Sequence, residues 1–225
     1  MDLSRVDIIR QATLETFESA ERIENFMPLL GFNDEIGSEQ PAIVHANTGG
    51  LRIWQYPNQF SKYLMFIKQF RASSYIEIGC RWGGTFIFTT EFLKRFGTVT
   101  ESVAVDIFDS PVADYCALNP ETKFLKMNST GPEFKEFIST RVFDIVFIDG
   151  DHSYSGVKAD FETTRNSGKI FVFHDISSDA CPGVVQFWNE LKTLEGFSCI
   201  EFTEQYPDVN GNFLGIGVAI NKQVV

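Results

Sequence analysis

The chain has 225 residues, of which 44% are hydrophobic and 22% are charged, and its formal net charge is −11. This length and composition are typical of a globular protein with one sizeable core, and the acidic balance argues against non-specific binding to nucleic acid or to an anionic membrane. No run of 18 apolar residues occurs, so no transmembrane helix is expected. Phenylalanine, with 23 copies, predicts a core rich in aromatic rings.

The cysteines and the first residues bear on the cellular compartment. Cys80, Cys116, Cys181 and Cys199 form no Cys-x-x-Cys pair, and the opening Met-Asp-Leu-Ser-Arg-Val-Asp does not have the pattern of a signal peptide. We therefore expect reduced cysteines in a cytoplasmic protein rather than disulfides or a zinc site.

Residues 2–26 are predicted to form one helix, because apolar residues recur there at steps of three and four. Pro28 and Gly31 are expected to end it. The apolar stripe of this helix is compatible with a cap on the domain and with a homodimer contact, and the pattern does not distinguish the two.

Residues 32–58 have a mixed composition with no regular period. Long irregular segments in compact domains are often functional, so one interpretation is a lid over the active site. The other is a surface strap packed by Trp54 and Tyr56. His45, within this segment, is expected to be structural, with a substrate contact as the alternative. A helix is predicted to follow over residues 57–70.

A glycine-rich turn joins a short apolar strand over residues 75–78 to a helix over 85–96. Gly79 and Gly83 permit positive φ and close approach of a ligand to the backbone at the start of that helix. Glu77 supplies an acid just before the turn. No Lys followed by Ser or Thr comes after the glycines, and the dinucleotide pattern Gly-x-Gly-x-x-Gly is missing.

Strand and helix patterns then alternate to the end of the chain. We predict further strands over residues 102–107, 123–127, 143–148, 169–173, 197–202 and 213–220, and helices over 131–140, 154–165 and 182–195. This order predicts an α/β fold with a Rossmann-like, doubly wound, mostly parallel sheet and a C-terminal antiparallel strand pair. Residues 59–225 would form this domain, and residues 1–58 an N-terminal helical extension.

Polar residues follow several of these strands, where ligands bind in open α/β sheets. Asp106 ends the second strand and is expected to bind ribose hydroxyls, with a solvated or capping Asp as the alternative. Asn128 and Ser129 follow the third strand, and both an adenine contact and a plain turn fit them. Two successive later strands end in Asp149-Gly-Asp-His152 and in His174-Asp175.

The stretch from Phe147 to Glu162, together with residues 170–176 and 183–188, resembles a bacterial branch of the class I S-adenosylmethionine-dependent methyltransferases. That branch is related to the macrocin and other sugar O-methyltransferases and to cephalosporin hydroxylase-like proteins. The turn pattern Glu-x-Gly-x-x-x-Gly-Gly resembles the first motif of the same class. The resemblance covers about residues 50–222.

The resemblance implies a role for each matching residue. In the sugar O-methyltransferases, acids that end the fourth and fifth strands hold a divalent metal, and a His three residues after the first acid is the general base. Asp149 and Asp175 match the metal-binding acids, and His152 matches the base. His174 stands where the family has an acid, which weakens the case for Mg²⁺ or indicates a softer divalent metal; Asp151 could supply an oxygen. The implied cofactor-binding residues are Glu77, Gly79, Arg81, Gly83, Asp106, Asn128, Ser129 and Asp149.

The resulting hypothesis is a methyltransferase that uses S-adenosylmethionine, with or without Mg²⁺ or another divalent metal, to methylate a hydroxyl of a sugar or glycosylated small molecule. A base of near-neutral pKa would activate that hydroxyl. Three alternatives are a cofactor-binding protein without catalysis, a nicotinamide-dependent enzyme, and a metal-dependent hydrolase that uses the Asp/His cluster. For His152 alone, a capping or structural role is the alternative to catalysis.

Overall fold

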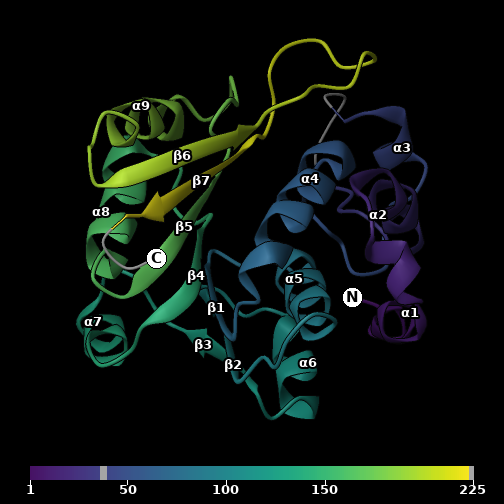
Figure 1. The fold of residues 1–225 in the computed structure, drawn as a ribbon, viewed down its shortest axis with the longest axis horizontal. Coiled ribbons are helices and arrows are strands. Elements are labelled where there is room, and N and C mark those ends of the chain that lie inside the picture. The colour runs from purple at the N-terminus through teal and green to yellow at the C-terminus, as the bar shows by residue number, and fades with distance from the viewer. Residues whose placement is uncertain (36–39, 223–225) are drawn as a thin grey trace.

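The computed structural model describes residues 1–35 and 40–222. Their seven strands form one sheet in the order β3-β2-β1-β4-β5-β7-β6 (Figure 1). The strands are β1 (Ser74–Ile78), β2 (Glu101–Asp106), β3 (Thr122–Lys126), β4 (Phe143–Ile148), β5 (Gly168–His174), β6 (Phe197–Phe202) and β7 (Ile216–Asn221). Strands β1 to β5 are parallel, and β7 runs antiparallel to both β5 and β6.

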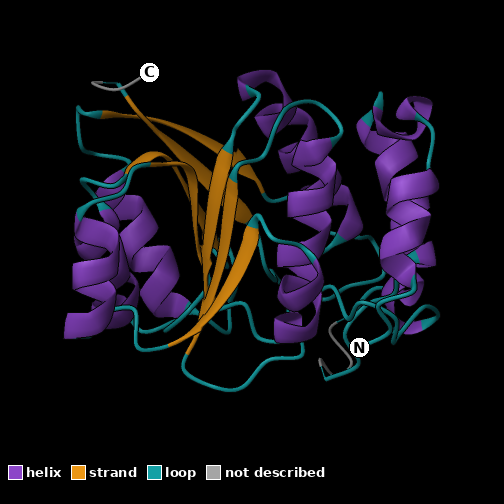
Figure 2. Cartoon of the chain, turned by 90° about the horizontal axis from the view of Figure 1, so that it is seen from below, coloured by secondary structure: helices purple, strands orange, loops and turns teal. Residues whose placement is uncertain are grey.

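Helices cover both faces of the sheet (Figure 2). One layer contains α4 (Pro57–Ile67), α5 (Gly84–Lys94) and α6 (Val112–Leu118), and the other contains α7 (Pro132–Ser139), α8 (Tyr154–Thr164) and α9 (Pro182–Leu191). Outside the first layer, α1 (Arg5–Gln11) packs on α5 and α2 (Ala20–Phe26) packs on α4. Shorter elements are α3 (Ala42–His45), η1 (Leu14–Phe17), η2 (Met27–Leu29) and η3 (Lys68–Phe70).

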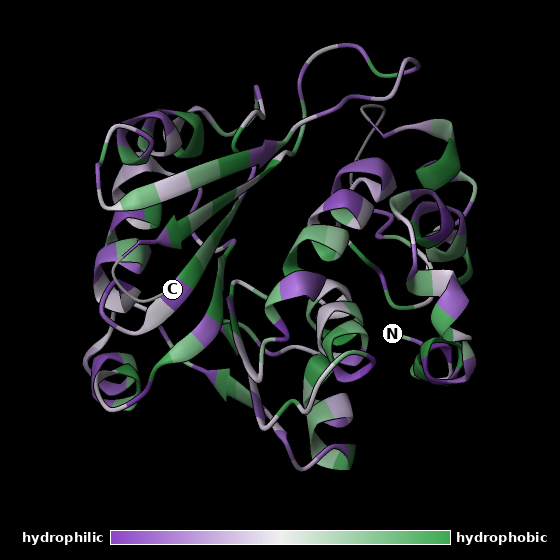
Figure 3. Cartoon of the chain, in the orientation of Figure 1, coloured by the Kyte–Doolittle hydropathy of each residue, from purple (hydrophilic) through white to green (hydrophobic). Residues whose placement is uncertain are grey.

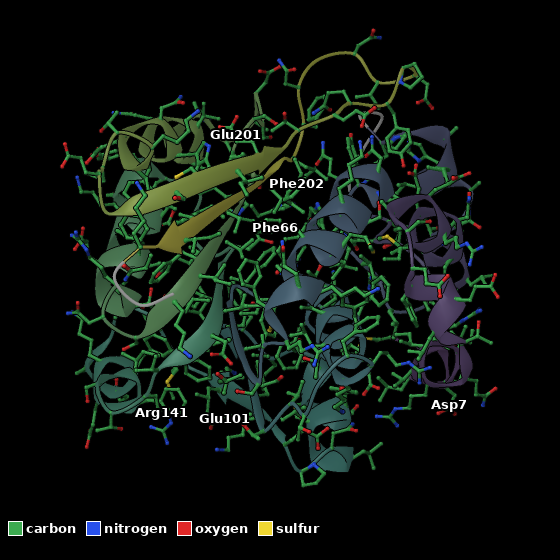
Figure 4. All side chains as sticks on the ribbon, viewed as in Figure 1. Asp7, Phe66, Glu101, Arg141, Glu201 and Phe202 are labelled. Carbon is green, nitrogen blue, oxygen red and sulfur yellow. The ribbon has the colours of Figure 1, made fainter. Side chains whose placement is uncertain are left out.

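Alternating residues of each strand supply two separate cores, as the period of two in a strand requires. In β1, Tyr75 packs in the core under α4 and α5, whereas Ile76 packs in the core under α7, α8 and α9. Strands buried on both faces are apolar along their length, and the strands are coloured mainly as hydrophobic in Figure 3. Phe66 of α4 and Phe202 of β6, whose ring centroids are 6.0 Å apart, extend this packing to the edge of the sheet (Figure 4).

The predicted fold class is confirmed, including the mostly parallel sheet and the antiparallel pairing of the last two strands. The sequence patterns did not indicate that β7 inserts between β5 and β6, and they missed α6. That helix is only seven residues long and buries Val112 and Tyr115 alone, so its apolar period is too short to recognise. No helix in the described part of the chain is long and apolar enough to cross a membrane.

The single helix predicted over residues 2–26 is wrong, because the chain forms α1, η1 and α2 instead. Extended backbone at Ala12, with ψ at 141°, ends α1, and the Arg95 guanidinium donates to the Ala12 carbonyl oxygen at 2.7 Å. Phe17 in η1 is fully buried against aromatic rings of α2 and α5. The Ser19 side chain then caps α2. The free energy gained by burying the Phe17 ring therefore outweighs the cost of interrupting the helix.

The segment over residues 32–58 is packed as a strap on the domain. Leu51 and Ile53 are buried, and backbone bridges join Phe32 to Thr48 and Ile53. Positions 36–39 of the turn expected at its start lie outside the described residues.

Glu91 of α5 links the N-terminal extension to the domain. Its buried carboxylate accepts two hydrogen bonds from Arg10 of α1, at 2.7 and 3.0 Å, and one from the Tyr115 hydroxyl at 2.7 Å. Burial alone would raise the pKa of Glu91, but the bonds from Arg10, Tyr115 and Lys94 lower it below its ordinary value. The stability that this lowered pKa provides is present above the ordinary pKa and is lost on acidification.

We predict that Glu91→Gln lowers the free energy of unfolding at neutral pH by about 2 kcal/mol, because the half-exposed Arg10 loses its charged partner. Urea denaturation across pH measures this, with Glu136→Gln on the exposed side of α7 as the control. The difference from wild type should shrink as the pH falls below the ordinary Glu pKa of 4.5. A difference that is constant with pH would contradict the assignment.

Candidate active site

One cavity of about 1090 Å³ lies at the carboxyl ends of the parallel strands. It is large enough for a nucleoside and a second small ligand, because the pockets that hold one drug-sized ligand are about 300–1,000 Å³. Every residue assigned from the sequence to the cofactor, catalytic or metal site lines this cavity: Glu77, Gly79, Arg81, Gly83, Asp106, Asn128, Ser129, Asp149, His152, His174 and Asp175. Parallel strands bring these side chains together from five separate loops.

The glycine turn is held by two positions that admit no side chain. Gly79 has φ +82°, and a Cβ atom there would lie 2.1 Å from the carbonyl oxygen of Asp149. Gly83 has φ +86°, and its Cβ would lie 2.4 Å from the Val112 side chain. The turn after β1 therefore sits directly on the loop after β4, and α5 begins at the cavity wall.

The expected ribose and adenine residues line the cavity, but they also organise their own loops. Asp106 accepts hydrogen bonds from the backbone N–H of Arg81, at 2.8 Å, and of Phe108, at 3.0 Å. Asn128 accepts from the N–H of Thr130 at 2.9 Å, as in an Asx turn. The alternatives of a capping Asp106 and a plain turn at Asn128 therefore describe part of what these residues do.

Glu77 is buried beneath the glycine turn. Only 1% of it is exposed, and its carboxyl group accepts a hydrogen bond from the Tyr75 hydroxyl. Burial raises its pKa well above the ordinary value, with Asp149 adding to the effect. A positively charged group in the cavity would favour the ionised form of this acid.

Two histidines and two aspartates form a compact cluster beside the turn. Asp149 Oδ1 lies 3.2 Å from His152 Nε2 and 3.1 Å from His174 Nδ1. Asp175 Oδ2 lies 3.5 Å from His152 Nδ1 and 3.4 Å from His174 Nδ1. Each imidazole thus contacts both carboxylates, which come from the ends of β4 and β5.

These contacts shift the protonation of the cluster. Burial alone would raise the pKa of Asp149, but the facing His174 and His152 lower it. The hydrogen bond to Asp149, followed by that to Cys181, raises the pKa of His152. His152 is therefore protonated at neutral pH in this arrangement. For His152 to act as the near-neutral base expected from the sequence, part of the negative charge of Asp149 and Asp175 would have to be neutralised.

Nearby polar groups take other roles. Ser153 is the N-cap of α8 and accepts from the N–H of Gly156 at 3.0 Å, so His152 does not cap this helix. Asp151 accepts from the N–H of Ser153 at 2.8 Å, and its carboxylate does not join the Asp149, His174 and Asp175 group. His45 lies exposed on α3 and does not line the cavity.

The donor set of Asp149, His174 and Asp175 fits a divalent cation. Their ligand atoms lie within 4.8 Å of one another. Adjacent ligands of an octahedral ion at Mg²⁺-like bond lengths are about 3 Å apart, close to the 3.1 Å between His174 Nδ1 and Asp149 Oδ1. Two carboxylates with one imidazole suit metals somewhat softer than Mg²⁺.

Several cavity residues were not anticipated. Asp160 of α8 is buried and accepts from the Ser129 hydroxyl at 2.6 Å, and burial raises its pKa to about 6. Cys181 lies 3.3 Å from His152 Nδ1. Trp54 and Phe213 line the cavity from the strap and from the loop before β7. The sequence does not show that these residues reach the cavity, because their positions depend on contacts between distant parts of the chain. Only Asp160 could have been predicted, since the helical period places it on the inner side of α8.

Comparisons with known proteins agree with this geometry. Residues 76–176 match a family model described as a methyltransferase domain. Rhamnosyl O-methyltransferases from Mycobacterium bovis and Mycobacterium tuberculosis are 23% identical in an alignment of 143 positions that covers 59% of this chain and 58% of each relative. The chain therefore spans less than two thirds of their length.

Two solved structures share the fold. The O-methyltransferase from Bacillus cereus in complex with SAH has a TM-score of 0.55 and 14% identity, covering 97% of this chain and 96% of that chain. The O-methyltransferase TomG from Streptomyces achromogenes, in complex with SAM, has a TM-score of 0.57 and 15% identity, covering 79% and 84%.

The fold and the matched domain indicate the class of the protein. The sheet order, the glycine turn and the methyltransferase-domain match over residues 76–176 support a class I S-adenosylmethionine-dependent methyltransferase. The resemblance drawn from its motifs is thereby confirmed. The matched methyltransferase domain runs over residues 76–176, from the third residue of β1 to the residue after Asp175.

We predict that Gly79→Ala reduces the affinity for S-adenosylhomocysteine by at least about 100-fold, because the new methyl group would force the turn away from Asp149. Gly196→Ala is the matched control, since a Cβ at Gly196 meets no atom within 4 Å. Isothermal titration calorimetry of both variants measures the effect. Unchanged binding by Gly79→Ala would show that the cofactor does not use this turn.

Proposed function

We propose that this protein transfers the methyl group of S-adenosylmethionine to a hydroxyl of a sugar or glycosylated small molecule, assisted by a divalent cation. The observation that carries the proposal is the position of the Asp149, His152, His174 and Asp175 cluster in the same cavity as the glycine turn. A hydrolytic metal site would have no need of that turn. The relatives described as rhamnosyl O-methyltransferases support a sugar acceptor.

The cofactor side of the cavity is proposed to lie between the loops after β1, β2 and β3. S-adenosylmethionine, when bound, supplies a methyl group on a positively charged sulfonium. Six carboxyl groups line the cavity: Glu77, Asp106, Asp149, Asp151, Asp160 and Asp175. This acidic lining favours a cationic ligand. Glu77 would face its ammonium group and Asp106 its ribose hydroxyls, with Arg81, Asn128 and Ser129 in the same wall.

The acceptor is proposed to enter on the side of His152, between Trp54 and Phe213. Aromatic rings offer a flat apolar surface to the C–H face of a sugar. His152 has 42% of its side chain exposed, whereas His174 has 2%. His152 is therefore the histidine that an incoming hydroxyl can reach, and its role is to take the proton as the methyl group is transferred.

A divalent cation would be held by Asp149, His174 and Asp175. Bound there, it would lower the pKa of a neighbouring hydroxyl and fix its position. Both carboxylates that face His152 belong to this set, so cation binding would also remove the charge that keeps His152 protonated. The proposed base and the proposed metal are therefore coupled through the same two aspartates.

We predict that His152→Gln lowers kcat by at least about 100-fold, as expected for loss of a general base, while the Kd for S-adenosylhomocysteine stays the same. Methyl-transfer assays on a panel of rhamnosides and nucleotide sugars, with calorimetry in parallel, measure both. His45→Gln, outside the cavity, is the control. Full activity of His152→Gln would exclude His152 as the base.

We also predict that Asp175→Asn lowers the affinity for Mn²⁺ by about tenfold or more, because it removes a charged ligand from the site. Calorimetric titration of the protein with Mn²⁺ measures this without an acceptor. Asp114→Asn, on the exposed surface of α6, should leave Mn²⁺ binding unchanged. Equal Mn²⁺ affinity of Asp175→Asn and wild type would place the metal elsewhere.

A further inference from the structure

A second group of ligating atoms lies next to the one already described. His152, Asp175 and Cys181 each offer one atom, and these atoms all lie within 4.8 Å of one another. Cys181 Sγ is 3.3 Å and Asp175 Oδ2 is 3.5 Å from His152 Nδ1. The thiol and the carboxyl group are buried, and all three residues line the cavity.

The backbone holds these three residues in place. Cys181 is the N-cap of α9, and its carbonyl oxygen accepts from the N–H of Val184 at 3.0 Å. Gly183, in the first turn of α9, packs so closely on the 152–154 backbone that a Cβ would lie 2.7 Å from the His152 carbonyl oxygen. This contact fixes Cys181 beside the imidazole, so the pairing of thiol and imidazole is a feature of the packing.

The spacing of the atoms matches a tetrahedral metal ion. Zinc binds nitrogen and oxygen at about 2.0–2.2 Å and sulfur at about 2.3 Å, so its tetrahedral ligands are about 3.3–3.8 Å apart. The two measured separations from His152 Nδ1, 3.3 and 3.5 Å, lie in this range. A set of imidazole, carboxylate and thiolate suits a thiophilic cation rather than Mg²⁺.

We propose that His152, Asp175 and Cys181 form a binding site for zinc and other thiophilic divalent cations, which shares only Asp175 with the Asp149, His174 and Asp175 site. Binding would replace the thiol proton of Cys181 by a sulfur–metal bond and the Nδ1 proton of the protonated His152 by a nitrogen–metal bond, and both protons would pass to solvent. Because all three residues line the cavity, a fourth coordination position would be open to it, as in an open zinc site.

Occupancy of this site has a consequence for activity that rests on the proposed role of His152. A cation on His152 Nδ1 would hold the imidazole in place. It would also bind the carboxylate of Asp175, which would then no longer be available to the site formed with Asp149 and His174. Zinc would therefore inhibit methyl transfer by competing with the activating cation. Hard cations select the oxygen-rich set and soft cations the thiol-containing set, so the identity of the cation would determine whether the enzyme is active.

Titration of the metal-free protein with Co²⁺ tests the site independently of catalysis, because a cobalt–thiolate bond gives an intense near-ultraviolet charge-transfer band. We expect this band in the wild type, its displacement by Zn²⁺, and its loss in Cys181→Ser. Cys199→Ser, on β6 away from the cavity, should keep it. Zinc affinity by competition should fall by about tenfold or more in Cys181→Ser.

No band in the wild type, or a band that survives in Cys181→Ser, would overturn the proposal. S-adenosylhomocysteine calorimetry and circular dichroism of Cys181→Ser confirm that the variant is folded. In methyl-transfer assays, zinc should inhibit the wild type more strongly than Cys181→Ser, each compared with its own zinc-free rate. A cobalt–thiolate band without any methyl transfer would keep the metal site and reject the proposed function.

Discussion

The close contact between Gly79 and the carbonyl oxygen of Asp149 constrains the whole site. Because no Cβ atom fits between them, the backbone of the turn after β1 packs directly against the backbone of the loop after β4. Pairing of β1 with β4 in the centre of the sheet makes this contact possible. The glycine turn and the Asp/His cluster therefore line one cavity, which is the arrangement that the proposed in-line transfer between two bound reactants would need.

Charge is the second constraint on this cavity. Its acids outnumber its arginines, and Arg52 and Arg81 are both engaged by Glu35, at 3.8 and 3.2 Å. Without a cation the cluster balances its carboxylates with protonated histidines. A sulfonium and a divalent metal would satisfy the same carboxylates and leave His152 free of its proton. In the proposed mechanism, binding of these cations would therefore prepare His152 to act as the base.

The sequence predicted the mostly parallel sheet, its flanking helices other than α6, and the loops that line the cavity, since these depend on local apolar periods and on the rule that ligands bind at carboxyl strand ends. It did not predict that β7 inserts between β5 and β6. It did not predict the break in the first helix, because burial of Phe17 depends on rings in α5. Nor did it reveal the pKa of His152 or the partner of Cys181, which are set by side chains that meet only in the folded chain.

Anomalous diffraction from crystals grown with S-adenosylhomocysteine and Mn²⁺ would locate both proposed ligands in one experiment. We predict a manganese peak bounded by Asp149, His174 and Asp175, with the sulfur of the cofactor product in the same cavity and its ribose at Asp106. A manganese peak outside this cluster, or a cofactor bound away from Gly79, would contradict the proposed cation-assisted methyl transfer.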